Sequence, residues 1–103
     1  MNAAEHLHIE LPQPFLPGMT KLVFRGERQI LIVNAQGVLR AIDNSCPHAG
    51  SSLFGGKLVG RLLRCPSHGL MIDLATGCMA GGTGPGARIY RVEATPNGAI
   101  LEI

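Results

Sequence analysis

Two short cysteine–histidine pairs are the residues of this chain whose types and spacing can do chemistry. The first pair is Cys46-Pro47-His48, and the second is Cys65-Pro66-Ser67-His68, which follows after the sixteen residues 49–64. Each pair offers one thiolate and one imidazole, and the proline after each cysteine fixes the backbone φ and stiffens the segment. Two sulfur and two nitrogen donors, brought together from two loops, can hold a metal centre.

Two kinds of metal centre use this donor set. In one kind of 2Fe–2S centre, two histidines on one iron replace two of the four cysteines, so that two mixed loops can clamp the cluster from both sides. A tetrahedral zinc site also takes two cysteines and two histidines, and the segment from Cys65 to Gly69 is similar to a zinc knuckle. The single residue between Cys46 and His48 is a short spacing for zinc, which favours the cluster.

Short β-strands are the elements that must position these loops. Aliphatic and β-branched runs bounded by turn residues predict five strands of the main frame. They lie at 21–26, 28–33, 38–42, 88–93 and 99–103. The segments 34–37 and 95–98 have the composition of hairpin turns. Fourteen glycines and seven prolines leave no room for a long helix, so we expect an all-β fold, an antiparallel sandwich or small barrel.

The two ligand pairs interrupt this frame. Segments 44–56 and 65–69 are rich in Gly, Ser and Pro, and two short strands are expected between them, at 57–59 and 61–64. At 103 residues the chain is long enough for one domain. The expected division of this single domain, 1–103, is a basal β part, 1–43 and 87–103, and an inserted cluster-binding lobe of two loops, 44–86.

Composition and charge exclude several classes of function. Nine basic and seven acidic residues give a net charge of +2, which is too weak to imply nucleic-acid binding. No stretch approaches eighteen uninterrupted apolar residues, so no membrane span is expected. The odd number of cysteines argues against a disulfide framework and favours a reducing, cytoplasmic setting. Without a nucleophile–base set or a phosphate loop, we expect no enzymatic activity of the chain's own.

The charge is distributed unevenly along the chain. No acidic residue lies between Asp43 and Asp73, whereas Lys57, Arg61 and Arg64 lie within that span. This basic segment is interpreted either as a solvated surface or as a docking face for an acidic partner. A small apolar patch for docking is expected beside it, unless its residues line the core instead; its members are Leu53, Phe54, Pro66 and Leu70.

With these motifs in place, the chain resembles a Rieske ferredoxin, the soluble carrier of bacterial ring-hydroxylating dioxygenase systems. The resemblance rests on the strand pair at 31–43, the first loop through Leu53, the second loop, the segment Met71–Gly77 and the run 81–86. It implies a Rieske-like fold and one 2Fe–2S cluster, with Cys46 and Cys65 as ligands of the inner iron. It also implies that His48 and His68 bind the outer iron, near the surface.

The resemblance implies an electron carrier rather than an enzyme. Single electrons would pass from a flavin-dependent NAD(P)H reductase to a terminal ring-hydroxylating oxygenase, through transient docking near His48 and His68. A carrier of this kind is expected to be a monomer. Two alternatives stay open: a Rieske-like small subunit of a nitrite reductase or another larger oxidoreductase, and a structural zinc-binding module.

The chain departs from the respiratory branch of the family in ways that bear on its reduction potential. Where that branch has a disulfide between the two loops, this chain has Ser51 and Ser67. Where that branch has hydroxyl donors to sulfur, this chain has Leu70 and Ile72. Fewer donors predict a potential toward the low end of the Rieske range of about −150 to +300 mV. The remaining cysteine, Cys78, is expected to be a buried, inert thiol.

Overall fold

Nine short strands make up the regular structure of the residues that are described. The computed structural model describes residues 5–47, 50–67, 69–79 and 86–103, and within these ranges no helix occurs and every strand pairing is antiparallel. The strands are β1 (His6–Glu10), β2 (Thr20–Arg25), β3 (Arg28–Ala35), β4 (Val38–Asp43), β5 (Lys57–Val59), β6 (Leu62–Arg64), β7 (Met71–Asp73), β8 (Ile89–Thr95) and β9 (Gly98–Glu102). The predicted all-β class is confirmed.

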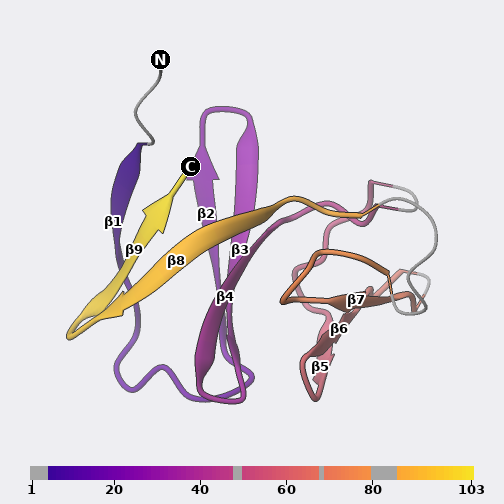
Figure 1. Ribbon diagram of the computed structural model, residues 1–103, viewed down its shortest axis with the longest axis horizontal. Helices are drawn as coiled ribbons and strands as arrows, with labels where there is room; N and C mark the ends of the chain where they lie inside the picture. Colours follow the sequence, from indigo (N-terminus) through magenta and orange to yellow (C-terminus); the bar gives the residue numbers. More distant parts are fainter. Residues whose placement is uncertain (1–4, 48–49, 68, 80–85) are drawn as a thin grey trace.

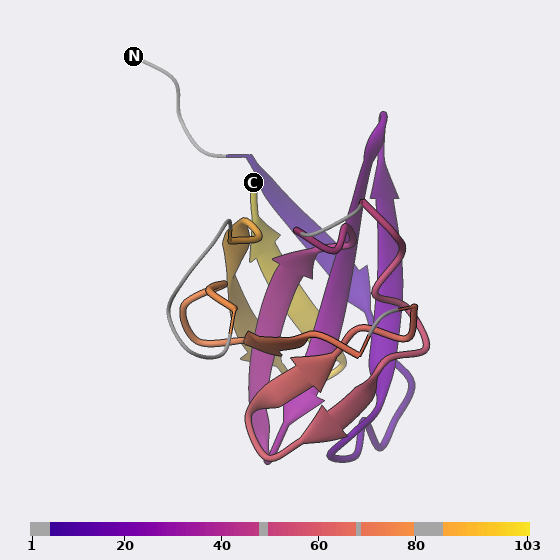
Figure 2. The same ribbon diagram turned by 90° about the vertical axis from the view of Figure 1, so that its right-hand side faces the viewer.

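The strands form one large sheet and one small sheet. The large sheet has the order β1-β9-β8-β4-β3-β2, and the small sheet has the order β5-β6-β7. Figure 1 shows the small sheet to one side of the large one, and Figure 2 shows it from in front. Leu101 of β9 and Val23 of β2 belong to the same buried cluster although several strands separate them in the order. The large sheet is therefore curled into a half-barrel.

Strand β3 separates two hydrophobic cores because its side chains are buried on both faces. Ile30 and Ile32 point into the core enclosed by the curled sheet. Leu31 and Val33 alternate with them and belong to a second core, which lies between the large sheet and the small one. All four side chains are fully buried, as the two-residue period of a strand requires when both of its faces are covered. The second core fastens the small sheet to the half-barrel.

The hairpin between β3 and β4 shows how local turn chemistry sets the strand register. The predicted turn at 34–37 tightens to two central residues, Gln36 and Gly37, with φ of 58° and 93°. Positive φ at both positions matches the twist of the flanking strands. The Asn34 side chain accepts a hydrogen bond from the Gly37 N–H at 2.7 Å. This turn fixes the pairing of β4, which leads directly into the first cysteine loop.

The end of β4 is held by Tyr90 of β8. Tyr90 is buried, and its hydroxyl donates a hydrogen bond to Asp43 Oδ1 at 3.1 Å. The Asp43 N–H donates to the Arg88 carbonyl at 2.8 Å. The Arg88 guanidinium lies 4.9 Å from the centre of the Tyr90 ring. These contacts fix the chain at the point where it leaves the large sheet for the first loop.

Replacing Tyr90 with phenylalanine should lower the free energy of unfolding by about 1–2 kcal/mol at neutral pH, because a bond to a charged acceptor is lost. Burial, followed by the nearby Asp43 carboxylate and its hydrogen bond, raises the pKa of Tyr90 above its usual 10.0. The stabilisation is thus present below about pH 10 and is lost as the pH rises through the raised pKa. Urea denaturation from neutral to alkaline pH should show the free energies of unfolding of wild type and variant converging. A difference between them that widens above about pH 10 would contradict this.

Candidate metal centre

The first cysteine loop is closed by two backbone hydrogen bonds. The Cys46 N–H donates to the Ser51 carbonyl at 2.7 Å, and the Gly50 N–H donates to the Cys46 carbonyl at 2.7 Å. Gly50 has a φ of 73°, a left-handed conformation that glycine adopts without strain. The chain is thereby folded back on itself within five residues of the cysteine.

The second cysteine loop repeats this geometry. The Cys65 N–H donates to the Leu70 carbonyl at 2.7 Å, and the Gly69 N–H donates to the Cys65 carbonyl at 2.8 Å, with Gly69 also at a φ of 73°. In both loops the bonds join the cysteine to the fourth and fifth residues after it. The loops share this turn although their histidines are spaced differently, at His48 and His68.

Both cysteines lie in the core between the two sheets. Cys46 and Cys65 are each 1% exposed and belong to one buried cluster, together with Leu53, Leu63 and Ile72. Two matched loops thus bring two sulfur atoms into one apolar environment from two directions. This arrangement fits an iron–sulfur cluster, because thiolates are its protein ligands and burial limits access of water to it.

The two predicted histidine ligands, His48 and His68, lie outside the described residues. In the described part of the chain, no three His, Cys, Asp or Glu side chains gather into a metal site. The structure places Cys46 and Cys65 in one buried cluster, and the assignment of all four residues as ligands stays a prediction.

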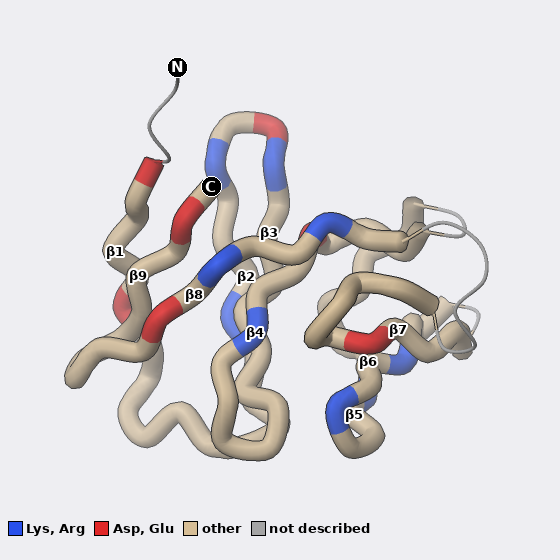
Figure 3. The backbone as a smooth tube through the Cα atoms, viewed as in Figure 1, with Lys and Arg blue, Asp and Glu red and all other residues tan. Residues whose placement is uncertain are grey.

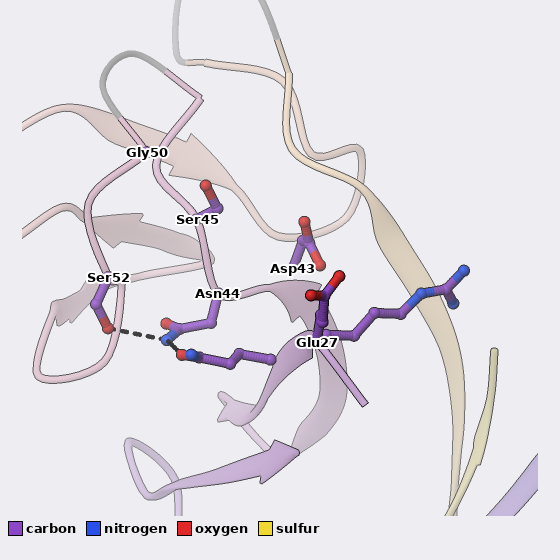
Figure 4. A pocket seen from close by; sticks show the side chains of 8 residues that line it. Glu27, Asp43, Asn44, Ser45, Gly50 and Ser52 are labelled. Atoms are coloured by element: carbon purple, nitrogen blue, oxygen red, sulfur yellow. Dashed lines mark hydrogen bonds between the residues drawn. The ribbon is translucent and has the colours of Figure 1, made fainter. Parts of the chain in front are cut away.

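Asn44 braces the first loop, and sequence reasoning missed it. Its Oδ1 accepts hydrogen bonds from the Leu53 N–H at 2.8 Å and the Phe54 N–H at 2.9 Å. Its Nδ2 donates to Ser52 Oγ at 2.9 Å and to Gln29 Oε1 at 3.1 Å. Figure 4 shows the last two of these bonds. The side chain of Asn44 therefore ties both ends of the Cys46 loop to each other and to the large sheet.

An open hollow of about 430 Å³ lies beside this brace. Figure 4 shows it between the β2–β3 turn and the first loop, with acidic and basic side chains at its edge. It is lined by Glu27, Arg28, Gln29, Asp43, Asn44, Ser45, Gly50 and Ser52. Its polar, open lining is not the enclosed apolar pocket that is typical of a small-molecule substrate site.

Gly56 joins the end of the first loop to the start of the second. A Cβ atom at this position would lie 2.5 Å from the Arg64 carbonyl oxygen and 2.9 Å from the Leu53 carbonyl oxygen. Only glycine allows the backbone to pass this close to the residue that precedes Cys65. The end of the first loop therefore passes directly against the backbone that precedes the second loop, an approach that the sequence alone did not indicate.

The prediction that Cys78 is buried is wrong, because its side chain is exposed. The backbone at Gly77 is buried, where a Cβ atom would collide with the Ala87 carbonyl oxygen. Met79 bridges to Ile72, and the intervening Cys78 faces solvent. Gly77 therefore takes the inward position that the thiol was expected to take.

Comparison with known proteins shows which family the chain belongs to. A family model, the Rieske [2Fe-2S] domain, matches residues 9–91. The ferredoxin component of naphthalene 1,2-dioxygenase/salicylate 5-hydroxylase systems from Ralstonia sp is 34% identical over 50 residues, which cover 48% of each protein. The chain thus spans about half the length of this relative, and other curated relatives are longer, with 10–14% of their length covered.

Solved structures agree with this assignment in fold. A chain of the complex of reduced oxygenase and oxidized ferredoxin in carbazole 1,9a-dioxygenase superposes with a TM-score of 0.81 at 24% identity, covering 92% of this chain and 99% of that chain. A Mycobacterium tuberculosis protein assigned as an NADH-dependent nitrite reductase small subunit gives 0.82 at 18% identity, covering 98% and 96%. At such identities the likeness establishes the fold alone. Since the family model covers most of the chain and the two cysteine loops lie within it, this protein belongs to the Rieske [2Fe-2S] domain family.

Proposed function

We propose that this chain is an electron-transfer protein, in which the lobe 44–86 holds one 2Fe–2S cluster. Cys46 and Cys65 would bind the inner iron, and His48 and His68 the outer one. The observation that carries the proposal is the matched pair of cysteine loops, which close with the same hydrogen bonds and place both sulfur atoms in one core. When bound, the cluster supplies a site that accepts and releases one electron.

The residues of the chain set the conditions for that transfer. Burial of Cys46 and Cys65 keeps water from the sulfur side, and the backbone hydrogen bonds that close each loop hold both cysteines in place. The first loop connects β4 of the large sheet to β5 of the small sheet, and the second loop connects β6 to β7. Both lie on the side of the molecule that faces the viewer in Figure 2, where a partner can approach them. None of the described segments is a helix long and apolar enough to cross a membrane.

The proposed role is a shuttle between a flavin-dependent NAD(P)H reductase and a terminal ring-hydroxylating oxygenase, by transient docking near His48 and His68. The name of the Ralstonia relative and the oxygenase–ferredoxin complex support this role. Transient redox contacts bury less than about 1,200 Å², so a monomer of this size is sufficient. We place the protein in the cytoplasm, where thiolates are kept reduced.

A second candidate role is that of a small subunit in a nitrite reductase or another larger oxidoreductase. The close fold match to the Mycobacterium tuberculosis protein favours it. The two roles differ in the stability of the partner complex. Native purification with the proteins encoded beside it should yield this chain alone if it is a shuttle, and a stoichiometric complex if it is a subunit.

Metal and sulfide analysis of anaerobically purified protein tests the proposed function. We expect two irons and two acid-labile sulfides per chain, a red-brown colour and a one-electron reduction. Stoichiometric zinc without sulfide would overturn the proposal and favour the zinc-module alternative.

Replacing Leu70 with serine should raise the reduction potential. Leu70 packs against the core that contains both cysteines, and its carbonyl accepts the Cys65 N–H. A hydroxyl at this position would supply a donor toward sulfur, and such bonds stabilise the additional negative charge of the reduced state. Potentiometric titration should show an upward shift from a wild-type value in the lower part of the range of about −150 to +300 mV.

The matched control is Leu62→Ser, which makes the same substitution in the small sheet, at the end of β6 beside the β5–β6 turn. This control should leave the potential unchanged. A wild-type potential above about +150 mV, or equal shifts in both variants, would contradict the argument.

A further inference from the structure

Two like charges face each other at the edge of the small sheet. Lys57 of β5 is the direct cross-strand partner of Arg64 of β6, and both side chains are exposed. Like charges directly opposite in an antiparallel pair destabilise the sheet. The next pair along, Leu58 and Leu63, packs against the core. The fold therefore needs the leucine pair, and it gains nothing from the cationic one.

No carboxylate of the chain neutralises this pair. Asp73, on β7 of the same sheet, accepts an ion pair from Arg61 Nε at 3.3 Å. Across the described residues, no ion pair reaches Lys57 or Arg64, and the positions outside the description contain no Asp or Glu. The repulsion between the two cations is thus uncompensated within the protein.

The net charge of the whole chain lies in the lobe 44–86. That segment has three cations and one carboxylate, whereas the remaining six cations and six carboxylates cancel. Figure 3 shows both signs distributed over the large sheet, and mainly basic residues on the small one. The lobe therefore presents a local positive potential on a protein that is otherwise balanced.

The pair lies beside the second cysteine loop. Lys57 and Arg64 line an open hollow of about 430 Å³ together with Gly55, Cys65, Pro66, Ser67 and Gly69. A Cβ atom built on Gly69 would lie 3.3 Å from Arg64 Nε, so the guanidinium lies against this loop. Of the predicted apolar patch, Leu53 is fully buried in the core and Phe54 is 52% exposed. Phe54 directly precedes Gly55 of the hollow in the chain, and a cationic hollow with an exposed aromatic residue one position away is suited to a protein contact.

We infer that the Lys57–Arg64 pair is the docking contact for a cluster of carboxylates on the redox partner protein, an inference that rests on the proposed electron-transfer function. A carboxylate between the two cations would form charge-assisted hydrogen bonds and remove their mutual repulsion. Contacts of this kind raise association rates and reject partners of the wrong charge. The cationic pair therefore selects an acidic partner surface and brings it to the Cys65 loop.

Peptide binding tests the inference directly. The probe is an octaglutamate peptide, with octaglutamine as the neutral control, titrated against the intact protein at low salt. Lys57→Glu and Arg64→Glu together should weaken octaglutamate binding about tenfold or more, whereas Lys21→Glu, the same charge reversal on β2, should change it less than about twofold. Added salt should weaken wild-type binding, because exposed charges are screened.

Stability provides a readout that separates docking from a structural role. The single variant Lys57→Glu places opposite charges across the β5–β6 ladder, so its thermal midpoint should rise while its affinity for octaglutamate falls. If the pair served the fold instead, this variant would lose stability. Equal octaglutamate affinity in Lys57→Glu and wild type, or equal wild-type binding of octaglutamine, would overturn the inference.

Electron transfer to small reagents links the pair to the redox site. Anionic ferricyanide should oxidise reduced Lys57→Glu more slowly than wild type, by about threefold or more, and the cationic tris(phenanthroline)cobalt(III) should oxidise it faster. Lys21→Glu should leave both rates unchanged. Identical rates in all three proteins would overturn the inference, as would preferential binding of a single-stranded DNA oligomer over octaglutamate. Absence of iron and sulfide would instead overturn the proposed function, and the peptide arm would still report on the pair.

Discussion

Cys46→Ser or Cys65→Ser should give a colourless protein without acid-labile sulfide. Each substitution removes one of the two thiolates proposed for the inner iron, and a serine hydroxyl does not replace a thiolate in this role. Because both positions are buried in the same core cluster, neither site can recruit solvent ligands freely. Visible absorption and iron and sulfide analysis measure the effect, which we expect to be a loss of most or all of the cluster.

Cys78→Ser is the matched control for this experiment. Cys78 is exposed and lies outside both loops, so this variant should keep the full iron and sulfide content. The thermal midpoint should follow the same pattern, because a cofactor that binds only the folded chain stabilises it by mass action. If Cys78→Ser lost the cluster while Cys46→Ser retained it, the proposed ligand set would be wrong.

The hairpin frame could be predicted because its determinants are local. Glycine and asparagine at turn positions and β-branched residues between them determine where strands begin and end. The strands around Asn34–Gly37 and Thr95–Gly98 therefore appear where the sequence places them. The order of the large sheet is not local, because β1 pairs with β9 from the other end of the chain. Such a pairing depends on burial shared across the whole sheet.

The candidate site likewise has features that the local sequence predicts and features that only the fold determines. The two cysteines and their glycines could be predicted from the sequence because each loop closes within five residues. The roles of Asn44 and Gly56 could not be predicted from the sequence, because they depend on groups that only the folded chain brings close to these two residues. Asn44 follows a strand, where an asparagine commonly marks a turn, and nothing in its neighbours reveals the four partners of its side chain. The exposure of Cys78 cannot be predicted from its residue type, because a free cysteine is usually buried and only the fold turns Gly77 inward in its place.

Asn44→Ala should destabilise the fold and release the cluster together. The substitution leaves the N–H group of the fully buried Leu53 without its acceptor, whereas the Phe54 N–H keeps a second acceptor, Ser52 Oγ, at 3.3 Å. One unsatisfied buried group costs about 1–3 kcal/mol, so the free energy of unfolding should fall by about that amount. The Cys46 loop then loses its brace to the large sheet, and iron and sulfide content should fall with it.

Asn34→Ala separates the loss of the loop brace from a general loss of stability. Asn34 is as buried as Asn44, at 7% exposed, and bonds to Phe15 and Gly37 at the opposite end of β4. Its removal should lower stability by a similar amount and leave the cluster content of the folded protein unchanged. Asn44→Asp should be intermediate, since a carboxylate accepts both N–H groups but cannot donate to Gln29. Equal cluster loss in Asn34→Ala and Asn44→Ala at matched folded fractions would mean that cluster retention follows global stability, and Asn44 would have no particular role in holding the Cys46 loop.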